Sequence, residues 1–155
     1  MPSFKTTRVV DHSADEMFAL VADVESYPQF LPMCEALRIR SSKERERKTL
    51  LLADMTVGYK AIRETFTSKV LLNPEEKTIN VAYVDGPFRY LDNQWRFEER
   101  GEGRSAVHFH IDYEFRNRIL GAVMGTMFDR AFRAFAEAFE RRADKLYGLN
   151  RKADV

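Results

Sequence analysis

Two histidines and a carboxylate lie close together late in the sequence, at His108, His110 and Asp112. This set has the two-histidine, one-carboxylate composition that binds iron in some oxygenases. The spacing is that of alternate residues on a β-strand, where side chains on one face stand about 6.6 Å apart and diverge. Phe109 and Ile111 occupy the positions between them and need the core. We therefore expect the histidines on the outer, solvated face and predict no metal site.

No other residue cluster indicates catalysis. Cys34 is the single cysteine, so an internal disulfide is excluded, and beside Pro32 and Met33 we interpret it as a small buried apolar residue. His12 is isolated and is expected at a strand end or on the surface. The sequence contains no Gly-x-Ser-x-Gly elbow and no Gly-x-Gly-x-x-Gly fingerprint. These observations predict a binding protein without a catalytic residue, and no resident cofactor.

Composition indicates one globular domain with little overall charge. The chain has 155 residues, 45% of them hydrophobic, which is enough for a core without disulfides. We expect a single domain over residues 1–148 and a flexible tail over residues 149–155. The net charge is +1, from 25 basic and 24 acidic residues, so no global field attracts DNA, and a nucleic-acid surface has to be a local patch.

Neither the N-terminal residues nor the longest apolar stretch suggests a membrane segment. The residues after Met1 lack the basic and then apolar run of a signal peptide, which predicts a cytoplasmic protein. The longest apolar stretch, Ile119 to Phe128, is far shorter than the roughly 20 residues that a bilayer requires.

Alternating apolar residues predict an antiparallel sheet. A first strand over Phe4 to Val10 is followed by a short helix, for which Ser13 and Glu16 form a capping box. The Tyr27 to Pro32 segment contains two prolines and permits at most a brief helical turn. The mixed-charge run from Ser41 to Lys48 is interpreted as an exposed hairpin turn. The other expected strands cover 37–40, 51–59, 62–70, 79–83, 91–97 and 107–115.

A long amphipathic helix is expected from Arg118 to Leu146, which contains no proline. Its apolar residues recur at steps of three and four: Leu120, Met124, Met127, Phe128, Ala131, Phe135, Ala138, Phe139 and Leu146. At about 1.5 Å per residue the helix is roughly 40 Å long, so it has to lie along a broad, curved sheet. Large aromatic side chains between such a helix and sheet favour a cavity for an apolar ligand.

Three segments together resemble a known family. They are the run from Tyr27 to Cys34, the Gly86-Pro87-Phe88 turn with the strand that follows it, and the strand from His110 to Phe115 that leads into the long helix. In this order they resemble the coenzyme Q-binding protein Coq10 / ribosome-association toxin RatA family of the START-like, helix-grip superfamily, which includes polyketide cyclase-like proteins. The resemblance covers about Phe4 to Gly148. It implies an α+β fold in which a curved antiparallel sheet of about seven strands wraps around the C-terminal helix.

The resemblance implies two different functions. Mitochondrial members bind ubiquinone and support respiration, whereas an enterobacterial toxin of a toxin–antitoxin pair blocks the association of ribosomal subunits. We favour binding of a polyprenyl quinone or a similar lipid, because the helix and strand patterns independently predict a cavity. Binding to the large ribosomal subunit is the alternative, with Arg130, Arg133, Arg141 and Arg142 as the basic face that meets RNA.

Alternation along the strands and helical spacing predict that ten residues contact the ligand. For each of them, ordinary core packing is the competing explanation of its apolar side chain. They are Phe30, Met55, Val57, Tyr59, Phe66, Val81, Trp95, Phe109, Phe128 and Phe135. Because a quinone tail resides in a bilayer, we also expect transient contact with the inner membrane surface, through the Tyr27 to Pro32 lip and the apolar start of the long helix.

Overall fold

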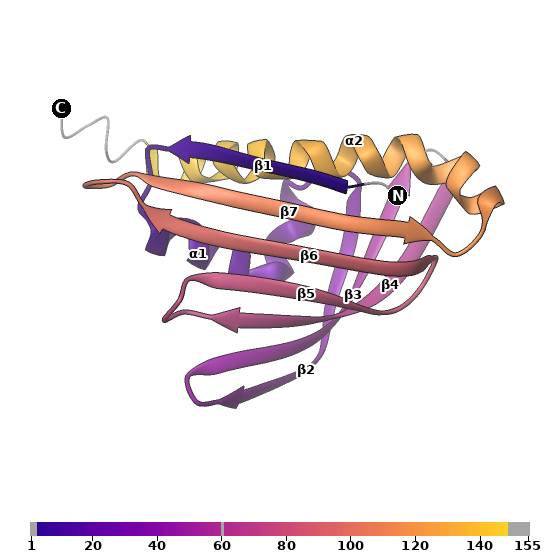
Figure 1. The fold of residues 1–155 in the computed structure, drawn as a ribbon, viewed down its shortest axis with the longest axis horizontal. Helices are drawn as coiled ribbons and strands as arrows, with labels where there is room; N and C mark the ends of the chain where they lie inside the picture. Colours follow the sequence, from indigo (N-terminus) through magenta and orange to yellow (C-terminus); the bar gives the residue numbers. More distant parts are fainter. Residues whose placement is uncertain (1–2, 60, 149–155) are drawn as a thin grey trace.

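The computed structural model describes residues 3–59 and 61–148 as one antiparallel sheet with a long helix along one face (Figure 1). The predicted fold class is confirmed. The strand order is β1-β7-β6-β5-β4-β3-β2, and paired neighbours are antiparallel. The elements are β1 (Ser3–Val10), α1 (Ala14–Ala22), η1 (Val24–Gln29), β2 (Cys34–Arg45), β3 (Lys48–Tyr59), β4 (Ile62–Asn73), β5 (Thr78–Asp85), β6 (Phe88–Glu99), β7 (Ser105–Phe115), α2 (Arg118–Ala143) and η2 (Asp144–Gly148). The tail expected over residues 149–155 lies outside the described residues.

The short helix α1 starts where the capping box predicts. The side-chain oxygen of Ser13 accepts from the Glu16 amide at 3.1 Å, and the Glu16 carboxylate accepts from the Ser13 amide at 2.9 Å. These bonds satisfy two amides that the first turn leaves without a helical partner. The next segment forms a 3-10 helix that contains Pro28, as its two prolines suggest.

Strand β7 shows why the outer histidines are not part of the core. Along this strand buried and half-buried residues alternate, so Phe109 and Ile111 point to the helix and His108 and His110 to the other face. The prediction from alternation is therefore confirmed.

The hairpin between β2 and β3 differs from its predicted form. The run from Ser41 to Lys48 was expected to be a turn, yet both strands continue through it and only Glu46 and Arg47 form the turn, with φ angles of 53° and 67°. The exposed hairpin is present, but the predicted length of its turn is wrong, because the hairpin tip extends past the core. Neither of its faces is buried there, so no apolar alternation marks the strands.

Helix α2 covers the inner face of the sheet, and four of its phenylalanines contact aromatic side chains of the strands. The side chain of Asn117 caps it by accepting from the Leu120 amide at 2.9 Å. Phe132, which the predicted stripe omits, is 4% exposed and belongs to the core. Leu146 was placed on the apolar face but is 46% exposed, because the chain winds into a wider turn, η2, after Ala143. Within the described residues, no helix is long and apolar enough to cross a bilayer.

Candidate functional site: an apolar cavity under the long helix

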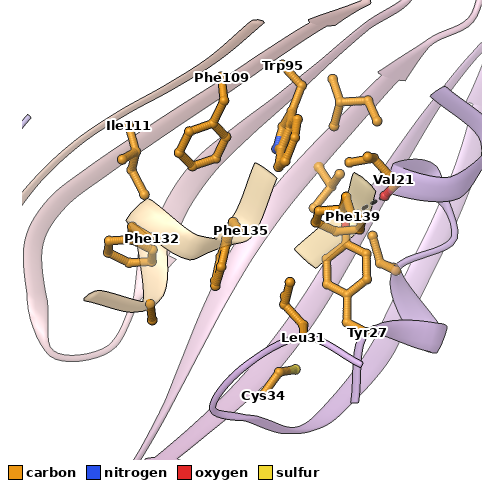
Figure 2. Packing of buried hydrophobic residues seen from close by; sticks show 14 of the residues in the cluster. Val21, Tyr27, Leu31, Cys34, Trp95, Phe109, Ile111, Phe132, Phe135 and Phe139 are labelled. Carbon is orange, nitrogen blue, oxygen red and sulfur yellow. Dashed lines mark hydrogen bonds between the residues drawn. The ribbon is translucent and has the colours of Figure 1, made fainter. Parts of the chain in front are cut away.

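A cavity of about 70 Å³ lies between α2 and the inner face of the sheet. In Figure 2, Trp95 and Ile111 on the strands face the phenylalanines of α2, and these two strand residues line the cavity. The lining residues are Val24, Tyr27, Leu37, Ala53, Met55, Phe66, Ser68, Val70, Val81, Leu91, Asn93, Trp95, Ile111, Phe132, Phe135 and Phe139. Pockets that enclose drug-sized ligands measure about 300–1,000 Å³. The cavity in this conformation is therefore much smaller than a quinone ring with its tail.

The structure separates the ten predicted ligand residues into groups. Those that line the cavity are Met55, Phe66, Val81, Trp95 and Phe135. Val57, Phe109 and Phe128 are buried in the surrounding core but do not line it. Phe30 borders a separate surface groove between η1 and α2, and the side chain of Tyr59 lies outside the described part of the chain.

Two polar residues in the cavity wall escaped the sequence analysis. Asn93 has both ends of its amide engaged: Nδ2 donates to the carbonyl oxygen of His110 at 2.9 Å, and Oδ1 accepts from Nε1 of Trp95 at 3.0 Å. Ser68 is 5% exposed, and within the described residues its Oγ has no hydrogen-bond partner. A buried hydroxyl without a partner is unfavourable. The Ser68 hydroxyl is therefore the group in the cavity wall best suited to bind a polar ligand group. The sequence did carry a signal for this residue, because Ser68 is polar at a position of β4 where the alternating pattern has apolar residues.

The lip at η1 closes one end of the cavity through aromatic packing. The hydroxyl of Tyr27 donates to the carbonyl oxygen of Val21 at 2.5 Å, and burial raises the pKa of this phenol well above its usual range. The Tyr27 ring packs edge-on against Phe139 of α2, with centroids 5.2 Å apart. The phenol therefore stays neutral and holds the lip on the helix.

The thiol of Cys34 is buried and weakly reactive, as the sequence suggests. Burial raises the pKa of its thiol to about 11, and only the thiolate is nucleophilic. At pH 8 we expect Ellman's reagent to label Cys34 about 10²-fold more slowly in the native protein than in the urea-unfolded chain, because the thiolate is so rare. The labelling rate should rise about tenfold per pH unit below this pKa. Equal rates in the native and unfolded chain would contradict the buried position.

The histidines each have a structural partner. His12, expected at a strand end or on the surface, lies just after the end of β1 but is 1% exposed. Its Nε2 lies 2.7 Å from Oδ1 of Asp144, which joins the start of α1 to the end of α2. His108 lies 3.0 Å from the Glu98 carboxylate, and His110 lies 3.2 Å from that of Asp112. Among the described residues, no group of three histidine, cysteine or acidic side chains could hold a metal ion.

A long helix closing an apolar cavity over a curved antiparallel sheet defines a helix-grip domain. The family described as "Polyketide cyclase / dehydrase and lipid transport" matches residues 10–140. The chain belongs to this family, and within it to the branch that contains RatA and Coq10.

Three known proteins illustrate the relationship. The ribosome association toxin RatA of Escherichia coli (strain K12) is 35% identical over 147 residues, which cover 95% of this chain and 90% of RatA. The mitochondrial coenzyme Q-binding protein COQ10 homolog B of Xenopus laevis is 26% identical over 94% of this chain and 59% of its own. The solution structure of the 18 kDa protein CC1736 from Caulobacter crescentus superposes with a TM-score of 0.77 at 31% identity, over 96% of this chain and 99% of that protein.

Proposed function

We propose that this protein binds a ribosomal subunit and hinders the association of subunits, and that it does so in the cytoplasm without catalysing a reaction. One observation carries the proposal: 35% identity to a ribosome association toxin extends over 95% of this chain and 90% of the toxin. The small cavity supports it, because a volume of about 70 Å³ leaves little room for the lipid that we favoured from the sequence. We therefore expect the residues that carry the function to lie on the outer surface.

Subunit joining tests this function directly. Purified small and large subunits are mixed with the protein, Mg²⁺ is restored, and the products are separated on a sucrose gradient. We expect the peak of joined ribosomes to fall as protein is added, and the protein to sediment with one subunit. Complete joining at an excess of protein, with no protein in any subunit fraction, would exclude this function.

A second candidate function is the binding of an apolar ligand with one polar end, such as a polyprenyl quinone. The observation that favours it is the unpartnered Ser68 hydroxyl in an otherwise apolar wall. A quinone tail is as apolar as the bilayer around it, so moving it into the cavity gains little free energy, although each buried CH₂ is worth about 0.8 kcal/mol against water. Selectivity then depends on hydrogen bonds to the ring oxygens, and uptake requires the lip or the aromatic side chains to move.

The ligand test is extraction of protein purified from its native host, followed by mass spectrometry. If the second function holds, the organic extract contains a quinone at a substantial fraction of one molecule per chain. Recovery of phospholipid only, combined with no binding of added quinone, would exclude it.

Replacing Ser68 by valine tests the cavity wall. We expect Ser68→Val to raise the free energy of unfolding by about 1 kcal/mol in a urea titration, because it removes an unpartnered buried hydroxyl and adds a methyl group beside free volume. If Ser68 binds the ligand, the quinone content of the extracted protein falls as stability rises.

Ser105→Val is the matched control. The hydroxyl of Ser105 also has no hydrogen-bond partner among residues 3–59 and 61–148, but the residue is 0% exposed and does not line the cavity. Overpacking there typically costs about 1–3 kcal/mol, so this variant should gain no stability. Equal effects at the two serines would mean that the volume beside Ser68 is not available to a side chain.

A further inference from the structure

The outer face of the β2–β3 hairpin and the adjoining strand carries more cations than carboxylates. In this register, positions opposite one another in paired strands share a face, and the buried Leu51 and Ala53 mark the inner one. The cationic side chains on the outer face are Arg38, Arg40, Lys43, Arg45, Lys48 and Lys69, and we call this set the hairpin basic face. The carboxylates on the same face are Asp54, which lies among these cations, and Glu35, which is paired with Arg63 at 2.9 Å. The whole chain, by contrast, has nearly equal numbers of basic and acidic residues.

Most of these cations are free to bind an external anion. Arg38 and Arg40 approach the same Asp54 carboxylate at 3.8 and 3.7 Å, so one negative charge serves two guanidinium groups. Lys43, Arg45 and Lys48 have no ion-pair partner in the described part of the chain.

Two of the four helix arginines that the sequence suggested are paired with carboxylates, whereas Arg130 is exposed and has no ion-pair partner among the described residues. Arg133 is paired with Asp129 at 3.1 Å and stacks over Phe4, and Arg141 is paired with Glu137. Arg142 donates to the amide of Gln29 at 2.9 Å and lies over the ring of Phe30. Within the described residues, the hairpin basic face therefore carries more cations without a carboxylate partner than α2 does, and it lies at the opposite side of the view in Figure 1.

The shape of the face indicates which polyanion fits it. From Arg38 to Arg45 the strand extends about 23 Å, at 3.3 Å per residue, and three strands give a width of about 10 Å. The outer positions of β2, β3 and β4 next to the cations are serine, leucine and threonine, with no aromatic side chain on which an unpaired base could stack. Proteins that bind single-stranded RNA rely on such stacking, whereas double-helical RNA is bound through its backbone.

Charged residues on an edge strand also prevent sheets from pairing with one another, and β2 is an edge strand. Protection of this edge explains the charges on β2 but not Lys48 on β3 or Lys69 on β4, so the excess of cations on this face requires an additional explanation. We propose that the hairpin basic face binds the phosphate backbone of double-helical RNA, without reading its sequence. This inference rests on the proposed ribosomal function, because it names the surface that meets ribosomal RNA.

A charge-removal experiment tests the inference. The triple variant Lys43→Gln, Arg45→Gln, Lys48→Gln is compared with a variant that removes three helix charges, Arg130→Gln, Arg133→Gln, Arg141→Gln. The probe is a fluorescent RNA duplex of about 20 base pairs, titrated between 50 and 200 mM KCl, beside single-stranded RNA and vesicles rich in anionic phospholipid. Thermal unfolding of each variant confirms that these exposed substitutions leave the fold intact.

We expect parent protein to lose about 10²-fold in affinity for the duplex over this salt range, as about four or five phosphate contacts require. The hairpin variant should bind at least about tenfold more weakly at 100 mM KCl, with a slope against log salt reduced by about 2 to 3. The helix variant should bind within about twofold of the parent. Equal losses in both variants, or preference of the parent for vesicles or for single-stranded RNA, would overturn the inference.

Sedimentation with ribosomal subunits separates this inference from the proposed function. If the parent binds duplex RNA through the hairpin but never sediments with a subunit, the ribosomal function fails and the RNA-binding face stands. If the hairpin variant still sediments with a subunit as the parent does, the ribosomal function stands and the hairpin is not its RNA contact.

Discussion

Truncation of Phe139 to alanine is expected to lower the free energy of unfolding by about 4 kcal/mol, within the usual range for a buried phenylalanine. The residue is 1% exposed and joins three parts of the fold. Its ring centroid lies 5.2 Å from that of Trp95 on the sheet and 5.1 Å from that of Phe30 on the lip. Loss of the ring removes these contacts together and leaves a larger void. Urea titration monitored by circular dichroism measures the effect.

The same variant reports on the cavity. Phe139 lines it, so the removed ring should enlarge it enough to bind benzene, which would restore part of the lost stability in the variant and none in the parent. Ile119→Ala on the same helix is the control, because this side chain is 76% exposed and its loss should change stability by less than about 0.5 kcal/mol. A loss below about 1 kcal/mol for Phe139→Ala would show that the ring does not pack as described.

Gly86→Ala is expected to destabilise the protein by about 3 kcal/mol or more, for two separate reasons. Gly86 has a φ of +144°, a conformation that residues with a β-carbon rarely adopt. A β-carbon there would also lie 2.6 Å from Cβ and 3.0 Å from Cα of Phe66, two atoms whose positions are fixed by the backbone of β4. The β5–β6 turn or strand β4 would have to shift. Thermal and urea unfolding measure the loss.

Gly101→Ala separates the two causes. Gly101 also has a positive φ, of +101°, but a β-carbon there meets no atom within 4 Å. This variant should therefore show the backbone term alone, about 1–2 kcal/mol. The difference between the two variants measures the clash with Phe66. If both lose the same stability, the close approach of the β5–β6 turn to β4 is not real.

The patterns that were correctly predicted depend on neighbours in the chain. Alternation along β7 places Phe109 inside and His108 outside, because successive side chains on a strand point to opposite faces. The capping box at Ser13 and Glu16 also needs only residues three apart. The same locality explains the error at the β2–β3 hairpin. Where both faces of a strand are in water, hydrophobic patterning no longer marks the strand.

The candidate sites depend on contacts between distant parts of the chain. The sequence by itself determined an amphipathic helix over an antiparallel sheet, and the apolar residues available to line a cavity between them. Only the tertiary structure decided that Met55 and Trp95 line the cavity while Val57 does not, and that Ser68 faces it without a partner. The cavity volume is a small difference between the space enclosed by the sheet and the side chains that fill it, so it follows from packing rather than from periodicity. The availability of charged side chains also depends on the tertiary structure. Arg141 is paired with Glu137, whereas Arg45 has no ion-pair partner among the described residues. That distinction exists only once side chains have been placed beside one another.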